Sequence, residues 1–192
     1  MKKIILASNS PRRKEILSKF NLDFDIITAD IDENVNPSIS AYELAANLAY
    51  KKAMSIASTI DYDAIIIGAD TIVFHNKIYG KPVDKIDAYN MIKNLSGKMH
   101  EVITGLAVID TSNNKKIKTY ETTEVYFREI EEDEINRYID TGEAFDKAGG
   151  YAIQGIASLF IKKIHGDYHN VVGLPIYKLN EILKNEFNIN LI

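Results

Sequence analysis

Apolar and polar residues follow two alternating patterns along the chain, near-continuous apolar runs and apolar positions spaced every three or four residues. The runs at 3–7 and 64–68 predict short strands buried on both faces. Helical spacing and capping residues predict helices at 11–20, 40–58, 84–95, 131–141 and 174–187. Segments rich in β-formers predict further strands and hairpins at 23–29, 71–79, 102–110, 117–130 and 151–164. Together they predict a mixed α/β fold around a twisted sheet.

Several element ends carry local signals. Ser40 with Glu43 forms a capping-box pattern at the start of one helix, and Gly142 follows the end of another. We expect Asp70 to end the 64–68 strand, with a hairpin at 71–79 turning at Asn76-Lys77. We expect strands broken by Gly155 at 151–164.

The junction of the first strand and first helix has the sequence SNSPRR, residues 8–13. Ser10 suits the N-cap and Pro11 the first helical position. Unpaired backbone N–H groups make such a turn a place for anions. Arg12 and Arg13 run against the preference of a helix start for acidic residues, which a bound polyanion would explain. On spacing alone, two ordinary surface arginines are an equally good reading.

Lys52 interrupts an apolar stripe. Leu44, Leu48 and Ile56 repeat every four residues on one helical face, and Lys52 falls on that face. A lysine whose stem is buried should reach a carboxylate or a phosphate. On periodicity alone, a lysine that snorkels at the edge of the stripe is the more common case.

Asp70 and Glu33 are the carboxylates that we single out for chemistry. An aspartate after an apolar strand can be a general base, a metal ligand or a plain turn residue. Because Asp is a weak base at neutral pH, it needs either burial or a metal that acidifies the attacking water. Base and metal ligand are partly competing roles, and composition does not choose between them.

Composition narrows the function classes. The 192 residues include no cysteine, which excludes disulfides and thiol chemistry and suits a reducing cytoplasm. The net charge of −4, from 23 basic and 27 acidic side chains, argues against binding nucleic acid. The sequence holds no apolar stretch of the length that a membrane span needs.

Several short segments follow one another along nearly the full length of the chain. They are LASNSPRR at 6–13, Glu33, Lys52-Ala53, GADT at 68–71, GKP at 80–82, DKAG at 146–149, IQG at 153–155 and GLP at 173–175. Any one segment is a weak signal, but their order and spacing together are a strong one. Taken together, they resemble the Maf family of nucleotide pyrophosphatases.

The resemblance implies an enzyme, a nucleoside triphosphate pyrophosphatase. Members hydrolyse nucleoside triphosphates to the monophosphate and pyrophosphate in the cytoplasm, with a divalent cation, Mg²⁺ or Mn²⁺. The implied fold is one domain over 1–192, two α/β lobes around a central cleft, similar to the house-cleaning inosine triphosphate pyrophosphatases. Family members also tend to form homodimers, which nothing in the sequence derives.

The resemblance also assigns roles to residues. It implies Asp70 as the catalytic carboxylate, with Glu33 and Asp70 as metal ligands. It implies that the triphosphate is bound by Ser8, Arg13, Lys52 and Lys81.

Arg12, Thr71 and Gln154 match the positions at which subgroups of the family differ, and the set looks like the dTTP/UTP subgroup. Arg and Gln can donate to the carbonyls of uracil and thymine, and CTP and modified pyrimidine nucleotides are further candidates. One departure is Gly150-Tyr151-Ala152 in place of the more frequent Ala-Tyr-Gly, which predicts a different backbone beside Gln154.

Two rival functions stay open. A regulator of cell division that senses nucleotides without hydrolysing them would share the same fold and basic pocket, so only turnover separates it from the enzyme. A nucleic-acid-binding module would show strong, salt-dependent retention of DNA or RNA, against which the net charge argues.

Overall fold

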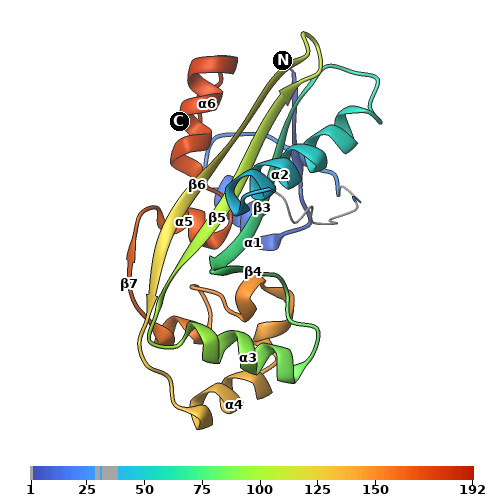
Figure 1. The fold of residues 1–192 in the computed structure, drawn as a ribbon. Coiled ribbons are helices and arrows are strands. Elements are labelled where there is room, and N and C mark those ends of the chain that lie inside the picture. Colours follow the sequence, from blue (N-terminus) through green and yellow to red (C-terminus); the bar gives the residue numbers. More distant parts are fainter. Residues whose placement is uncertain (1, 29–30, 32–38) are drawn as a thin grey trace. The chain divides into compact units, whose positions relative to one another are not determined.

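The computed structural model describes residues 2–28, 31 and 39–192. Within them, seven strands form one mixed sheet in the order β2-β1-β3-β5-β6-β7, with β4 paired to β3 (Figure 1). The strands are β1 (Lys3–Ala7), β2 (Asp25–Ile26), β3 (Ala64–His75), β4 (Lys77–Tyr79), β5 (Met99–Asp110), β6 (Lys115–Phe127) and β7 (Ile161–His165).

Helices separate these strands along the chain except at the β3–β4 and β5–β6 hairpins. They are α1 (Pro11–Leu17), α2 (Ala41–Ala57), α3 (Lys85–Leu95), α4 (Glu132–Asp140), α5 (Tyr168–Val172) and α6 (Ile176–Phe187), with 3₁₀ helices η1 (Glu143–Asp146), η2 (Ala148–Gly150) and η3 (Ile156–Phe160). The predicted mixed α/β class, a twisted sheet with flanking helices, is confirmed. The arrangement of two lobes around a cleft stays a prediction.

The chain divides into two compact units. Unit 1 comprises Met1–Asp70, Thr104–Glu121 and Gly173–Ile192, and unit 2 comprises Thr71–Ile103 and Thr122–Val172. The strands β3, β5 and β6 each contribute residues to both units.

In unit 1, α2 packs directly on the backbone of the sheet. A Cβ atom at Gly68 would lie 2.3 Å from the carbonyl oxygen of Ala49, and one at Gly105 would lie 1.9 Å from that of Ala45. These two glycines therefore allow the helix and the strands to approach more closely than any side chain permits. The other face is buried as well, since Ile65, Ile66 and Ile67 are each at most 1% exposed.

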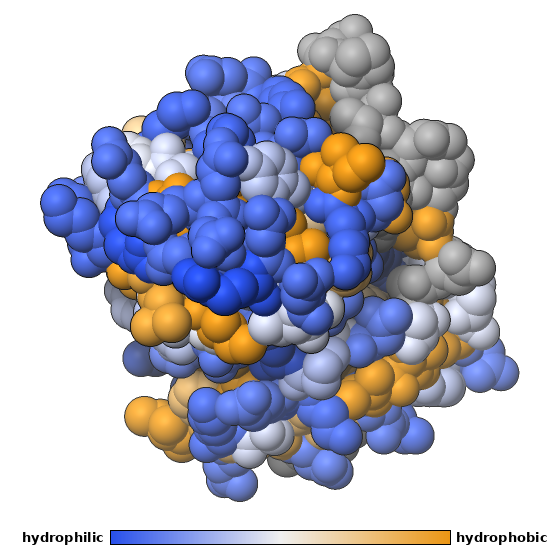
Figure 2. Space-filling model, turned by 90° about the horizontal axis from the view of Figure 1, so that it is seen from below, coloured by the Kyte–Doolittle hydropathy of each residue, from blue (hydrophilic) through white to orange (hydrophobic). Residues whose placement is uncertain are grey.

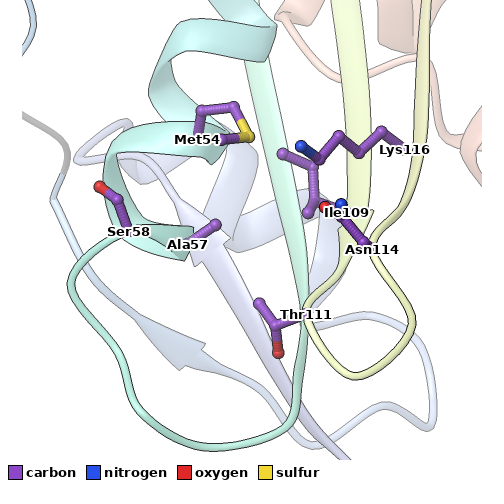
Figure 3. A pocket seen from close by; sticks show the side chains of 7 residues that line it. All are labelled: Met54, Ala57, Ser58, Ile109, Thr111, Asn114 and Lys116. Carbon is purple, nitrogen blue, oxygen red and sulfur yellow. The ribbon is translucent and has the colours of Figure 1, made fainter.

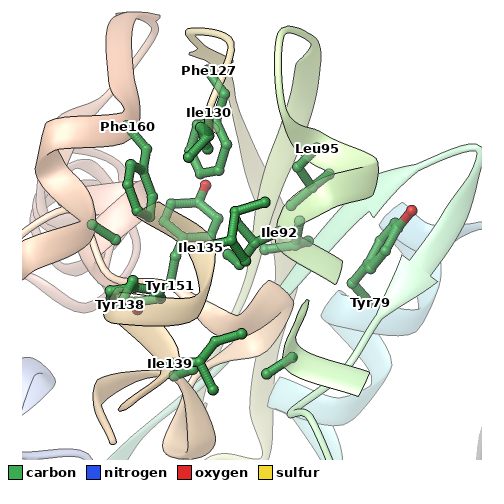
Figure 4. Close-up of a cluster of buried hydrophobic side chains, with 14 of the residues drawn as sticks. Tyr79, Ile92, Leu95, Phe127, Ile130, Ile135, Tyr138, Ile139, Tyr151 and Phe160 are labelled. Atoms are coloured by element: carbon green, nitrogen blue, oxygen red, sulfur yellow. The ribbon is translucent and has the colours of Figure 1, made fainter. Parts of the chain in front are cut away.

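Unit 2 is built around a cluster rich in aromatic residues (Figure 4). Phe127, Tyr138, Tyr151 and Phe160 are buried in it together with aliphatic side chains of α3 and α4. The β3–β4 hairpin turns at Asn76, which has a positive φ of 59°, and β7 pairs antiparallel with β6.

The local signals that we read as element ends are mostly confirmed. The Ser40 hydroxyl accepts the backbone N–H of Glu43 at 3.2 Å, and the Asp84 carboxylate accepts that of Asp87 at 2.8 Å. Gly142 follows α4 with a φ of 79°. Helix α1 ends at Leu17 rather than at residue 20, because the next bonds span three residues and tighten the chain into a turn.

Two predictions about strands are wrong. Asp70 does not end its strand, since β3 continues to His75 through the β-branched residues at 71–73, which favour extended backbone. Residues 151–164 hold a turn and η3 before β7 begins at Ile161. There, the Glu143 carboxylate accepts the backbone N–H of Ile156 at 2.9 Å, a contact from a distant part of the sequence that local propensity does not include.

The surface carries scattered apolar side chains. Seen from below, hydrophobic residues lie in separate patches among hydrophilic ones (Figure 2). Val83 before α3, Ile86 in the first turn of α3 and Leu159 in η3 are among those at least 70% exposed. Such scatter is ordinary for a folded protein. No helix in the described part of the chain combines the length and the apolar character that crossing a bilayer requires.

Candidate active site

The turn from β1 into α1 is held together by Ser8 and Arg13. The buried Ser8 hydroxyl accepts the backbone N–H of Ser10 at 3.2 Å and an Nη1–H of Arg13 at 3.2 Å. The Nε–H of Arg13 donates to the carbonyl oxygen of Gly173 at 2.7 Å. The structure thus brings Ser8 and Arg13 together and fixes the direction of the guanidinium.

Gly68 sets the distance between α2 and β3 at the point where the two charged residues stand. Because the helix touches the strand at Ala49 and Ala53, Lys52 lies within reach of Asp70, two residues beyond Gly68 on the same strand. The Lys52 ammonium donates to Asp70 Oδ1 at 2.5 Å.

The Lys52–Asp70 ion pair is nearly buried, with side-chain exposures of 14% and 11%. The expectation that Lys52 snorkels at the edge of its stripe is therefore wrong, and the alternative, a lysine that reaches a carboxylate, is right. Taking two charges out of water costs about as much free energy as their attraction returns, so such a pair is poorly explained by stability. The pair is therefore a candidate functional group.

Sheet register places the turn beside the ion pair within unit 1. The strands β1 and β3 are parallel, with Ala7 opposite Gly68. Ser8 therefore leaves β1 next to the Gly68–Asp70 segment. One carboxylate, one ammonium, one guanidinium and one hydroxyl gather at the carboxyl end of β1, beside the point in β3 where its pairing with β1 stops. Arg12, which is half-buried, follows on the same turn.

The predicted residues Thr71, Lys81 and Gln154 belong to unit 2. Thr71 follows Asp70 along β3 and is half-buried, with its side chain on the opposite face of the strand. Lys81 is exposed after β4, and the neighbouring Gly80 carbonyl accepts the N–H of Gly149 at 2.9 Å. This bond joins the segments GKP and DKAG, which are far apart in the sequence.

Gln154 is exposed on a turn in which the Gly155 N–H donates to the Ala152 carbonyl at 3.2 Å. Before this turn, Gly149 and Gly150 have positive φ angles of 68° and 75°. Glycine at 150 suits this backbone, because other residues would be strained there. The unusual order Gly-Tyr-Ala is therefore matched to the local conformation.

Glu33 lies outside the described residues, so only Asp70 of the two predicted metal ligands can be placed. Among residues 2–28, 31 and 39–192, no group of three or more His, Asp or Glu side chains is arranged to hold a metal ion. Mg²⁺ often binds through one or two carboxylates and takes its other ligands from substrate phosphates and water. A single buried carboxylate such as Asp70 fits that mode of binding.

A small hollow of about 140 Å³ lies elsewhere in unit 1 (Figure 3). It is lined by the end of α2 and by the β5–β6 connection, at Met54, Ala57, Ser58, Ile109, Thr111, Asn114 and Lys116. None of the predicted site residues lines it, and its lining offers no carboxylate. We therefore place no site there.

Sequence reasoning missed what anchors the predicted residues. The Gly173 carbonyl orients Arg13, although Gly173 was known only as part of a motif without a role. Gly68 likewise belongs to the GADT motif, and the sequence does not show its packing function. A glycine inside an otherwise bulky apolar strand is a usable signal for such a close approach.

Comparison with known proteins decides the family. The family described as "Maf-like protein" matches residues 3–186. The chain belongs to the Maf family. Proteins similar to this Maf chain include two named dTTP/UTP pyrophosphatase, from Alkaliphilus oremlandii (strain OhILAs) and Alkaliphilus metalliredigens (strain QYMF). Each is 55% identical over 192 residues, covering 100% of both chains.

Among solved structures, the Ham1 protein of Staphylococcus aureus has a TM-score of 0.42 and 17% sequence identity to this Maf chain. It covers 66% of this chain and 72% of its own.

Proposed function

We propose that this Maf protein hydrolyses dTTP and UTP to the nucleoside monophosphate and pyrophosphate. The observation that carries the proposal is the buried Lys52–Asp70 pair beside the Ser8–Arg13 turn. Full-length relatives at 55% identity that are named dTTP/UTP pyrophosphatase support the substrate class. CTP and modified pyrimidine nucleotides are further candidate substrates.

In this proposal Asp70 orients a water molecule, or removes its proton, for attack on the α-phosphorus. Lys52 holds one oxygen of Asp70, which fixes the direction of the carboxylate. Because an ammonium has three donors, Lys52 can contact a phosphate oxygen while it keeps this bond. Electrostatic stabilisation by placed cations is the main contribution in phosphoryl chemistry.

Arg13 and Lys81 supply further positive charge for the phosphates, and Ser8 holds the Arg13 guanidinium in place. A divalent cation, Mg²⁺ or Mn²⁺, would neutralise triphosphate charge and acidify the attacking water when bound by Asp70 and Glu33. We further propose that Arg12, Thr71 and Gln154 select the base. The absence of cysteine supports a cytoplasmic location, and the net charge of −4 argues against nucleic acid as a partner. A homodimer remains part of the proposal.

The test is product analysis with dTTP, UTP, CTP, ATP and GTP in Mg²⁺ or Mn²⁺, with pyrophosphate and phosphate measured separately. We expect pyrophosphate from dTTP and UTP. Asp70→Asn should lower kcat by about 10³-fold, because it removes the base and keeps the shape. Asp140→Asn, which removes an exposed carboxylate paired with Lys85, is the matched control and should leave kcat unchanged.

Release of phosphate instead of pyrophosphate would contradict the proposed reaction. Full activity in Asp70→Asn would contradict the role of Asp70. Binding of dTTP without turnover in either metal would favour the nucleotide-sensing regulator instead.

A further inference from the structure

The turn that carries Gln154 is held at both of its ends. The turn itself is closed by the Gly155 N–H, which donates to the Ala152 carbonyl at 3.2 Å. Gln154 is exposed, while Tyr151 before the turn and Ala157 after it are buried. An exposed side chain with buried residues on both sides has a fixed backbone from which to reach a ligand.

Tyr151 anchors the first end. Its hydroxyl lies 2.6 Å from Nε2 of the buried His100, and its ring packs edge-on against Phe127 at a centroid distance of 4.9 Å. These contacts hold the chain in the aromatic core of unit 2 just before the turn begins.

Glu143 anchors the second end from the start of η1. Its Oε2 accepts the backbone N–H of Ile156 at 2.9 Å, and its Oε1 accepts that of Ala157 at 3.4 Å. These are the first amides of η3, which a helix leaves without an internal partner. Hydrogen bonds that a backbone N–H donates to a carboxylate are among the stronger ones in proteins.

Gly155 makes the contact sterically specific. A Cβ atom at this position would lie 2.2 Å from Glu143 Oε1 and 2.5 Å from Oε2. Any residue other than glycine would push the carboxylate away from the two amides. The Glu143 carboxylate and Gly155 are thus fitted to each other immediately beside Gln154.

Glu143 is itself held in position. The Lys147 ammonium donates to its carbonyl oxygen at 2.8 Å, and the Glu143 N–H donates to the Thr141 hydroxyl at 3.3 Å. Burial raises the pKa of Tyr138, and the Glu143 carboxylate facing its hydroxyl raises that pKa further. The carboxylate therefore acts from a fixed backbone and not from a mobile loop.

We propose that Glu143 is a positioning residue for base recognition, because its carboxylate holds the turn that presents Gln154. The inference rests on the proposed role of Gln154 in reading the base. Glu143 itself makes no contact with the substrate in this proposal. Removal of the Glu143 carboxylate should weaken binding of the nucleoside moiety of the substrate and leave binding of its phosphate groups unchanged.

The experiment compares Glu143→Ala, Glu143→Gln and Gly155→Ala with Gln154→Ala as the reference and Glu132→Gln as the control. Glu132→Gln removes a carboxylate that forms an exposed surface ion pair with Lys93 in unit 2. Three quantities are measured on the full chain: KM and kcat for dTTP, inhibition constants for dTMP and for pyrophosphate, and hydrogen exchange of residues 155–160.

Glu143→Ala should raise KM for dTTP and the inhibition constant of dTMP by about tenfold, with a smaller change in kcat. The inhibition constant of pyrophosphate should not change, and exchange at 156 and 157 should accelerate. Glu143→Gln should raise KM for dTTP and the inhibition constant of dTMP by less than Glu143→Ala does, because the glutamine amide oxygen still accepts one of the two N–H groups.

Gly155→Ala should reproduce Glu143→Ala in the wild-type background and add little in the Glu143→Ala background, where the clash is gone. The comparison of the two single variants with the double variant, together with the milder Glu143→Gln, still tests the role of Glu143 if one of the variants folds poorly.

The proposal is overturned if exchange accelerates in Glu143→Ala while dTMP inhibition stays at the wild-type value, since Glu143 is then only structural. Equal weakening of dTMP and pyrophosphate would overturn it as well. If Gln154→Ala alone leaves dTMP inhibition unchanged in an enzyme that hydrolyses dTTP, the role of Gln154 fails, and this inference fails with it.

Discussion

The two units of this Maf protein are packed in different ways. In unit 1, the core cluster between α2 and the sheet is made of alanine and isoleucine, and helix backbone lies against strand backbone at Gly68 and Gly105. The core of unit 2 combines aliphatic side chains with aromatic rings in edge-on contact around Phe127 (Figure 4). Polar groups of His100, Tyr138 and Tyr151 are buried with these rings.

The difference matches what each unit presents. Close backbone contact in unit 1 leaves no freedom between α2 and β3, which suits a charged pair that must keep a fixed distance. In unit 2, the polar ends of buried rings hold loops, as when the Tyr138 hydroxyl donates to the Gly150 carbonyl at 2.9 Å. Unit 1 should therefore be sensitive to added atoms, and unit 2 to atoms and hydrogen bonds that are removed.

Removal of a ring from unit 2 should have the largest effect. Phe127→Ala deletes the ring that contacts His100, Tyr151 and Phe160, and should cost about 3–5 kcal/mol of unfolding free energy. Urea titration measures the loss. Leu159→Ala, at a side chain 70% exposed, should change it by less than about 1 kcal/mol. Equal losses would show that the aromatic cluster does not stabilise unit 2.

Addition of one methyl group to unit 1 should cause the second-largest loss of unfolding free energy. Gly105→Ala places a Cβ 1.9 Å from a helix carbonyl, so α2 must move, at a cost of about 3 kcal/mol. Gly80→Ala is the matched control, because no atom lies within 4 Å of its Cβ position. If Gly105→Ala unfolds at the same urea concentration as the control, the helix is not in firm contact with β5.

Acid should destabilise unit 2 through His100. Burial, with a smaller contribution from His75, lowers the pKa of His100 from 6.5 to about 3. Between these values the unfolded chain binds more protons, so stability is complete above pH 6.5 and falls by up to about 1.4 kcal/mol per pH unit below it.

The measurement is unfolding free energy between pH 7 and pH 4 for wild type and His100→Gln. Carboxylates contribute to both profiles, so the difference between the two slopes isolates His100. Parallel profiles would contradict a neutral, buried imidazole in the folded protein.

Loss of a single buried hydrogen bond should give the smallest of these effects. Tyr151→Phe removes the hydroxyl that lies 2.6 Å from His100 Nε2 and keeps the ring, at a cost of about 1–2 kcal/mol. Thermal unfolding of Tyr151→Phe and of the surface variant Tyr177→Phe provides the comparison, since Tyr177 is 72% exposed. An unchanged melting temperature would mean that the bond adds nothing to stability.

Much of the fold could be predicted because its signals are local. The helix caps at Ser40 and Asp84 and the helix end at Gly142 depend on residues within one helical turn. They can therefore be predicted directly from the sequence. The prediction failed at β3 because it ended the strand at Asp70 although the β-branched residues at 71–73 favour extended backbone. It failed at 151–164 because the 3₁₀ backbone of η3 is held by the Glu143 carboxylate, which lies outside the local stretch of sequence. Propensity is too weak to decide such a case.

The sequence by itself determined the α/β class, most element positions and, by resemblance, the family and the residues of interest. Tertiary structure alone decided which of those residues meet. Lys52 reaches Asp70 across 18 residues, Arg13 reaches Gly173 across 160, and Glu143 reaches Ile156 across 13. Each contact follows from sheet register and close packing, which sum many weak interactions over the whole chain, so no local window of sequence contains them.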